Sequence, residues 1–158
     1  MINKQEVLEL LDGAGIDYKL YEHAPVYTVE EALQVDMPYN EYGLKNLFLK
    51  DNKRNYYIYS LYGNKKADLK ALKAFLGVSN LRFASEEELK SVTGLEKGHV
   101  TPLGALGPEG DRVTLIFDDE IRDNIVGIHP MSNDATVFLG FDELYSFLSK
   151  RGVKIKMF

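Results

Sequence analysis

Two neighbouring apolar runs constrain the fold of this chain more than any other feature. "LKNLFLKD" and "NYYIYSLY" are rich in leucine and aromatic residues, and the turn-prone "DNKR" separates them. Short apolar runs on either side of a polar turn are typical of a β-hairpin. We therefore predict paired strands near residues 44–50 and 55–62, at the centre of a sheet.

Helix signals and further strand-like runs surround this hairpin. Residues that can cap a helix predict four helices, and an amphipathic pattern in "FDELYSFLSKRG" predicts a fifth. The four capped helices begin at Asn3 and end near Gly13, begin at Thr28 and end near Val35, begin at Asp68 and end at Gly77, and begin at Ser85 and end at Gly94. Further strands are predicted in "IDYKLYEH", "NLRFA", "RVTLIFDD", "NIVGIH", "ATVFLG" and "VKIKMF".

The order of these elements predicts the fold class. Strands and helices are interspersed without a repeating unit, and no low-complexity tract or linker divides the chain. A chain of 158 residues is long enough to bury one sizeable core. We expect a single α+β domain, residues 1–158, built around a mixed, barrel-like β-sheet.

Composition excludes several classes of site and surface. Without cysteine there can be no disulfide, zinc-thiolate site or cysteine nucleophile. A net charge of -5 argues against a broad surface for duplex nucleic acid but leaves room for a small contact with a nucleic-acid end. The N-terminal segment lacks the apolar core of a signal peptide, and no later run is long enough to span a bilayer. We expect a cytoplasmic protein that makes no membrane contact.

Two polar residues stand where a strand pattern predicts burial. Lys45 has the same parity as Leu47 and Leu49, so it either extends to solvent from the strand end or places a cation at a pocket mouth. His129 shares parity with Gly127 in a strand that Pro130 ends, which favours either a structural histidine or an imidazole facing a cleft.

The remaining motifs exclude familiar catalytic groups. His23, His99 and His129 do not have the spacing of metal ligands, and no serine lies in a Gly-x-Ser-x-Gly elbow. The glycine-rich stretch 98–110 lacks the Gly-Lys-Ser/Thr ending of a phosphate loop. A pliable loop, an inward lysine and a histidine at a strand end suit hydrolysis by an activated water, with backbone amides holding the oxyanion.

The motifs "LKNLFLKD", "TGLEKGHVTPLGAL" and "GIHPMSNDATVFL", in this order and spacing, resemble the YbaK/ProX family of free-standing aminoacyl-tRNA editing proteins. The resemblance covers nearly the whole chain. It is strongest to the ProXp-ala (PrdX) branch, which is related to the editing insertion of bacterial prolyl-tRNA synthetase and hydrolyses alanine mischarged onto proline tRNA. It implies a barrel-like mixed sheet with flanking helices and a pocket for the aminoacyl end of a tRNA.

The resemblance also implies roles for individual residues. Lys45 is expected to engage the substrate near its terminal phosphate or ester, and the loop from Gly98 to Pro102 to shape the site around the terminal adenosine and the aminoacyl carbonyl. His129 is expected to line the amino-acid pocket. The catalytic candidates are therefore Lys45, Gly98 and His129, and the substrate-binding candidates are His99, Val100, Thr101, Pro102, Gly127, Met131 and Asn133.

The implied chemistry is substrate-assisted, with a ribose hydroxyl of the terminal adenosine helping to place the water, and needs no metal or cofactor. A tight pocket can refuse the larger ring of proline, and Met131 is our candidate for that limit. A few cations, for example Lys45 with Lys50 or Lys65, would hold the tRNA acceptor end.

Three readings stay open at this point. The chain can be a deacylase of Ala-tRNA(Pro), a relative that acts on Cys-tRNA(Pro) or on Ser- or Thr-tRNA, or a binding module without turnover. The sequence also leaves open whether prolyl-tRNA synthetase or an elongation factor is a partner.

Overall fold

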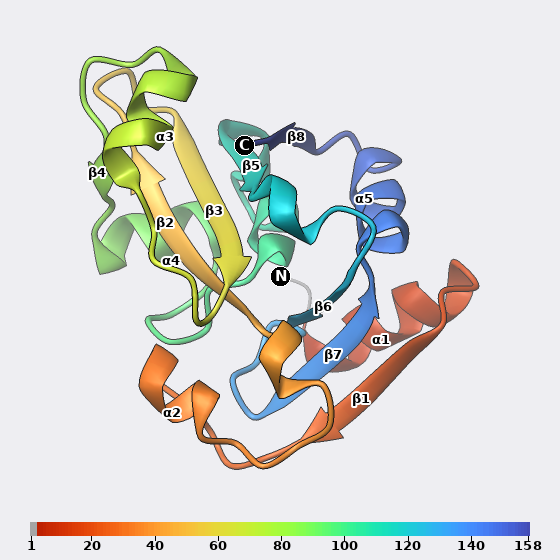
Figure 1. The fold of residues 1–158 in the computed structure, drawn as a ribbon. Helices are drawn as coiled ribbons and strands as arrows, with labels where there is room; N and C mark the ends of the chain where they lie inside the picture. The colour runs from red at the N-terminus through yellow and green to blue at the C-terminus, as the bar shows by residue number, and fades with distance from the viewer. Residues whose placement is uncertain (1–2) are drawn as a thin grey trace.

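The computed structural model describes residues 3–158, which form helices and strands interspersed along the chain (Figure 1). All five predicted helices and all eight predicted strands are confirmed. The helices are α1 (Lys4–Gly13), α2 (Val29–Leu33), α3 (Leu69–Leu76), α4 (Glu86–Thr93) and α5 (Phe141–Ser149). The strands are β1 (Tyr18–Glu22), β2 (Leu44–Lys50), β3 (Tyr56–Tyr62), β4 (Arg82–Phe83), β5 (Val113–Phe117), β6 (Ile125–Ile128), β7 (Ala135–Gly140) and β8 (Lys154–Met157).

The predicted caps explain where the helices begin. The side chains of Asn3, Thr28 and Asp68 each accept a hydrogen bond from a backbone amide of the first helical turn. Ser85 and Glu88 form the complete reciprocal capping box at the start of α4. These local bonds satisfy amides that have no partner within the helix, so they fix each helix start independently of the rest of the fold.

The strands form two sheets rather than one curled sheet. Strands β4-β2-β3-β5-β8 make a mixed five-stranded sheet, in which the predicted hairpin supplies β2 and the central strand β3. Strands β1-β7-β6 make an antiparallel three-stranded sheet. The expected α+β class is confirmed, while a single parallel bridge between Gly43 and Gly127 joins the sheets without closing a barrel.

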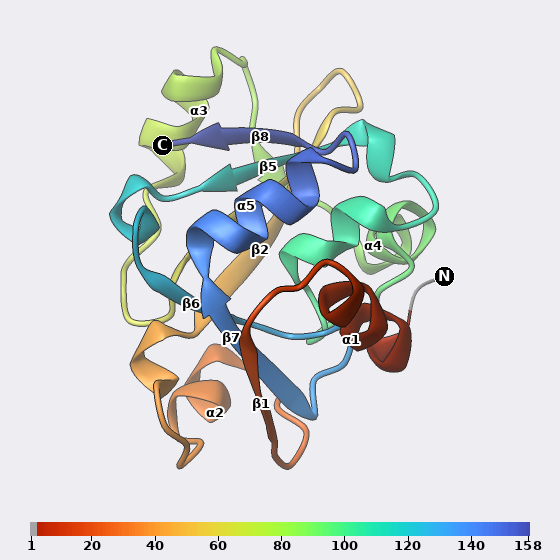
Figure 2. The same ribbon diagram turned by 90° about the vertical axis from the view of Figure 1, so that its right-hand side faces the viewer.

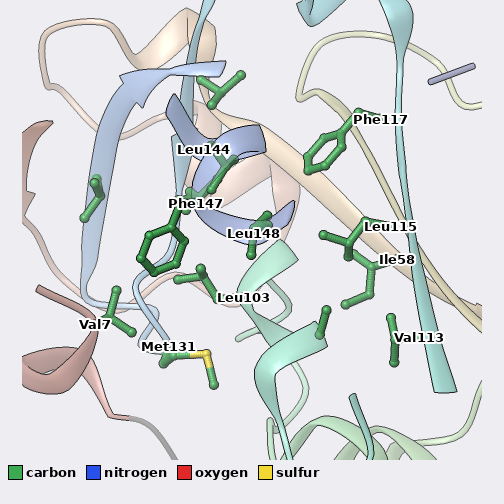
Figure 3. Packing of buried hydrophobic residues seen from close by; sticks show 14 of the residues in the cluster. Val7, Ile58, Leu103, Val113, Leu115, Phe117, Met131, Leu144, Phe147 and Leu148 are labelled. Atoms are coloured by element: carbon green, nitrogen blue, oxygen red, sulfur yellow. The ribbon is translucent and has the colours of Figure 1, made fainter. Parts of the chain in front are cut away.

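The main core lies between the two sheets, where α5 packs in the space that separates β5 and β8 from β7 (Figure 2). Leu144, Phe147 and Leu148 of α5 meet Ile58 and Leu115 of the larger sheet in this core (Figure 3). A smaller cluster on the opposite face of the larger sheet lies beneath α3. None of the helices in residues 3–158 is both long enough and apolar enough to cross a membrane.

Two glycines of the glycine-rich stretch, Gly107 and Gly110, lie where a Cβ atom would collide with neighbouring backbone. A Cβ atom added at Gly107 would lie 2.3 Å from the carbonyl oxygen of Thr93, at the end of α4. Gly107 has φ -75°, which any residue adopts, so the restriction is steric and does not come from backbone conformation. The close approach lets the 3-10 helix Pro102–Leu106 press Leu103 into the main core.

We predict that Gly107→Ala lowers the free energy of unfolding by about 1–3 kcal/mol, because the new methyl group collides with backbone that cannot rotate away. Gly13→Ala is the matched control, since nothing lies within 4 Å of a Cβ at Gly13 and alanine favours a helix. Urea denaturation of both variants checks this. Equal stability of Gly107→Ala and wild type would contradict the packing argument.

Candidate functional site

A cavity forms where the two sheets part along one edge of β2. Gly43, just before β2, bridges Gly127 of β6. At the other end of β2, its last residue Lys50 pairs with Arg82 of β4. Near the Gly43–Gly127 bridge, the loop that follows α4 packs against β2. Asn46 Nδ2 of β2 donates a hydrogen bond to the Val100 carbonyl oxygen of this loop at 3.3 Å. The cavity beside this loop has a volume of about 210 Å³.

The cavity wall combines apolar side chains, polar side chains and bare backbone. The apolar side chains come mainly from one segment, residues 26–37, which contains α2. The polar lining residues are His23, Thr28, Asn40, Lys45, Asn46, His129 and Thr136. Four glycines, Gly43, Gly63, Gly98 and Gly127, complete the lining. The site therefore suits a ligand that has both a small apolar group and several polar ones.

Lys45 supplies the cation of this site. It is the second residue of β2, is partly exposed, lines the cavity, and has no carboxylate partner among residues 3–158. An unpaired ammonium group at a cavity wall can bind a phosphate or a carbonyl oxygen. Of the two readings of Lys45, the structure therefore favours the cation at a pocket.

The two other lysines proposed to hold the tRNA are engaged elsewhere. Lys50 Nζ lies 2.8 Å from Glu88 Oε1, and Lys65 Nζ lies 2.6 Å from Asp118 Oδ2 and 3.0 Å from Glu120 Oε2. Neither lysine lines the cavity. The expectation that Lys50 or Lys65 assists Lys45 is therefore corrected, because their charges are neutralised within the protein.

His129 faces the cavity as a neutral imidazole. Burial lowers the pKa of His129 below its usual 6.5, and the neighbouring His23 and His99 lower it further, against the opposing effects of the Ala135 hydrogen bond and Asp134. His129 Nδ1 lies 3.0 Å from the Ala135 carbonyl oxygen. Because a carbonyl oxygen only accepts, Nδ1 bears the proton and Nε2 keeps a lone pair that can accept a hydrogen bond.

A second imidazole in the cavity escaped the sequence analysis. His23 Nδ1 lies 2.8 Å from the Ala24 carbonyl oxygen, so its Nε2 accepts a hydrogen bond from the Thr136 hydroxyl at 2.9 Å. The His23 and His129 rings meet edge to face, with centroids 6.4 Å apart. The strand-like run that ends in "YEH" was the available signal, but only the pairing of β1 with β7 brings His23 to Thr136 and so to this site.

The Gly98 loop presents backbone to the cavity. Gly98 has φ +86°, a conformation that favours glycine, and a Cβ there would also press on Tyr27, 3.3 Å from Cδ1. Within residues 3–158, the amides of Gly98 and Val100 have no hydrogen-bond acceptor. Both residues line the cavity. The two amides are therefore candidate backbone donors to a ligand.

Five of the predicted substrate-binding residues lie outside this lining. His99 is partly buried, and Thr101 and Pro102 are buried where the loop enters its 3-10 helix. Asn133 is buried, and its side-chain Nδ2 donates to the Val26 carbonyl oxygen at 2.9 Å. The backbone carbonyl oxygen of Asn133 accepts a hydrogen bond from the Val26 amide at 3.1 Å. Asn133 thus supports Val26 of the cavity wall, whereas Lys45, Gly98, Val100, Gly127 and His129 belong to the lining itself.

Met131 does not fit the role proposed for it. Its side chain packs in the main core together with Val7 and Leu103 (Figure 3) and does not line the cavity. Met131 has φ +64°, so the chain turns sharply after the strand and does not continue its alternation. Its proposed role as the limit on amino-acid size is therefore corrected.

The lining lacks the two commonest nucleophilic residues. It has neither serine nor cysteine, the Thr136 hydroxyl donates to His23, and the Thr28 hydroxyl caps α2. Within residues 3–158, no three His, Asp or Glu side chains are grouped so that they could hold a metal ion.

Comparison with known proteins gives a consistent result. The model of the aminoacyl-tRNA editing domain family matches residues 23–147. "Prolyl-tRNA editing protein ProX" of Acetoanaerobium sticklandii is 39% identical over 155 residues, covering 97% of this chain and 94% of its own. "Prolyl-tRNA synthetase associated domain-containing protein 1" of Danio rerio is 32% identical over 150 residues, covering 93% of this chain and 82% of its own.

A solved structure described as a "putative trans-editing enzyme for prolyl tRNA synthetase" superimposes with a TM-score of 0.72 at 22% sequence identity. The superposition covers 99% of this chain and 98% of that one. At this level of identity the match shows a shared fold.

We predict that the free energy of unfolding falls as the pH is lowered from 7 through 6.5, because unfolded His129 then binds a proton that the folded protein excludes. The loss ends once the pH is below the folded pKa, where both states are protonated. His129→Asn keeps a donor for the Ala135 carbonyl but does not titrate, so it should lose less stability over this range. Urea denaturation at pH 5, 6 and 7 measures the difference, and a His129 ring titration by NMR at or above pH 6.5 would contradict it.

Proposed function

The chain belongs to the aminoacyl-tRNA editing domain family, and from this premise we propose that it hydrolyses the ester bond of alanine mischarged onto proline tRNA. The observation that supports this best is the meeting of Lys45, Gly98 and His129 in one cavity whose lining contains neither serine nor cysteine. A phosphate-binding cation, backbone donors and a neutral imidazole suit the end of an aminoacylated RNA.

Each lining group has a part in the proposed reaction. The Lys45 ammonium binds a phosphate near the RNA end, which fixes the terminal nucleotide in the cavity. The free amides of Gly98 and Val100 stabilise the negative charge that develops on the ester carbonyl oxygen. The lone pair on His129 Nε2 accepts a hydrogen bond from the substrate amino group or the attacking water.

The proposed chemistry is a direct attack of water on the ester carbon. A bond forms between the water oxygen and this carbon, and the bond to the ribose oxygen breaks, so the products are alanine and uncharged tRNA. The neighbouring ribose hydroxyl helps to place the water and relays a proton from it to the departing ribose oxygen, which leaves as a hydroxyl group. Because the substrate supplies this hydroxyl, the absence of a serine or cysteine from the lining fits the mechanism.

The apolar part of the wall is the better candidate for amino-acid selection. Val29, Ala32 and Leu33 of α2 line the cavity, whereas Met131 does not. Attraction alone separates substrates that differ by one or two methylene groups by only about 1–3 kcal/mol each. A wall that leaves room for a methyl group but obstructs a pyrrolidine ring adds repulsion to this difference.

The charge of the protein is consistent with a small contact to the tRNA acceptor end. The chain has a net charge of -5, and Lys45 is the lysine of the cavity lining. A contact that neutralises one or two phosphates depends only weakly on salt.

We predict that Lys45→Ala slows single-turnover deacylation of Ala-tRNA(Pro) about 10- to 150-fold, the loss expected for one hydrogen bond to a charged group. Lys53→Ala is the matched control, because Lys53 is exposed in the β2–β3 turn and does not line the cavity. Lys45→Arg should retain part of the rate.

Parallel assays with Cys-tRNA(Pro) and Pro-tRNA(Pro) test the choice of amino acid. Alanine should be released fastest and proline slowest. Hydrolysis of cysteine in preference to alanine would change the assigned substrate, and no hydrolysis of any of the three esters would exclude the proposed activity.

A further inference from the structure

Tyr27 exposes an aromatic ring at the cavity instead of packing it into the core. It lines the cavity and is 61% exposed. Six large hydrophobic side chains are exposed among residues 3–158, and of these only Tyr27 and Leu33 belong to the cavity lining. An exposed aromatic side chain at a polar site commonly marks a binding surface.

The backbone that presents this ring is held on both sides. The buried Val26 exchanges two hydrogen bonds with Asn133, at 2.9 and 3.1 Å. The Tyr27 amide donates to Glu31 Oε2 at 3.4 Å, and the Thr28 hydroxyl accepts from the Glu31 amide at 3.1 Å. Because these bonds already restrict the backbone, a ligand that stacks on Tyr27 loses little free energy in ordering it.

Tyr27 lies next to Gly98, whose amide is proposed to bind the ester carbonyl oxygen. The ring contacts the Gly98 loop, since a Cβ at Gly98 would lie 3.3 Å from Tyr27 Cδ1 and 3.4 Å from Tyr27 Cα. Within residues 3–158, Tyr27 stacks on no other aromatic ring and lies under no cation. An aromatic face, the Gly98 amide and the Lys45 ammonium thus line one cavity.

These three groups match the three parts of an aminoacylated nucleotide. The ammonium suits the phosphate, the amide suits the ester carbonyl, and an aromatic face suits a base. We propose that Tyr27 is a binding residue of this site, which stacks on the terminal adenine base of the tRNA. The proposal rests on the proposed function, because it assumes that the cavity receives the aminoacyl end of an RNA.

An RNA hairpin with the acceptor stem of proline tRNA, carrying 2-aminopurine in place of the terminal adenine, tests this directly. Its fluorescence decreases when the base stacks on an aromatic ring. We expect quenching on titration with wild type and with Tyr27→Phe, which keeps the ring. Tyr27→Ala should bind about 5- to 150-fold more weakly, the range expected for loss of one stacked base, and should quench little.

Tyr145→Ala is the matched control, because Tyr145 is 40% exposed on α5 and does not line the cavity. It should behave as wild type. Equal binding and quenching by Tyr27→Ala and wild type would overturn the proposal, and so would binding by wild type without any fluorescence change or a failure of wild type to bind the hairpin.

Deacylation kinetics separate this proposal from the proposed function. With Ala-tRNA(Pro), Tyr27→Ala should raise KM and largely keep kcat, because the base takes no part in the bonds that form and break at the ester. If quenching depends on Tyr27 but the protein hydrolyses none of the charged tRNAs, the base site is supported and the editing activity is excluded. If Tyr27→Ala hydrolyses Ala-tRNA(Pro) normally and with an unchanged KM, the base site is excluded and the editing activity is supported.

Discussion

The parallel bridge between Gly43 and Gly127 is the constraint on which the site depends. It joins the two sheets at a single point, so that β2 continues alongside β3 while β6 continues alongside β7. The sheets must separate beyond this point, and the main core fills the space between them on one side. The cavity occupies the junction itself, where glycines leave backbone instead of side chains in the wall.

The elements of the fold were predictable because their signals are local. Asn3, Thr28, Asp68 and Ser85 cap helices through bonds to residues three positions away, which a sequence displays directly. The division into two sheets was not predictable in this way, since it depends on pairing between residues far apart, such as Gly43 with Gly127. His23 shows the same limit, because its bond to Thr136 arises only from the register of β1 on β7.

The failed assignments have physical reasons of the same kind. Met131 follows Pro130 and adopts a left-handed backbone conformation, which a strand pattern does not indicate, and its side chain packs in the core. Lys50 and Lys65 belong to basic clusters in the sequence, but the fold brings Glu88 to one and Asp118 to the other. Lys45 differs because no acidic side chain in residues 3–158 lies within ion-pair distance of it.

The positions of His129 and Lys45 in the cavity wall determine which charges a ligand meets there. Burial keeps His129 neutral near pH 7, and the Ala135 carbonyl fixes its proton on Nδ1. Lys45 then supplies a charge in the same cavity as an imidazole that can accept a hydrogen bond. A protonated His129 would repel a substrate ammonium group, whereas the neutral ring accepts a bond from it. Under the proposed function, the depressed pKa and the unpaired lysine would act together, since one would admit the amino group of the substrate and the other would attract its phosphate.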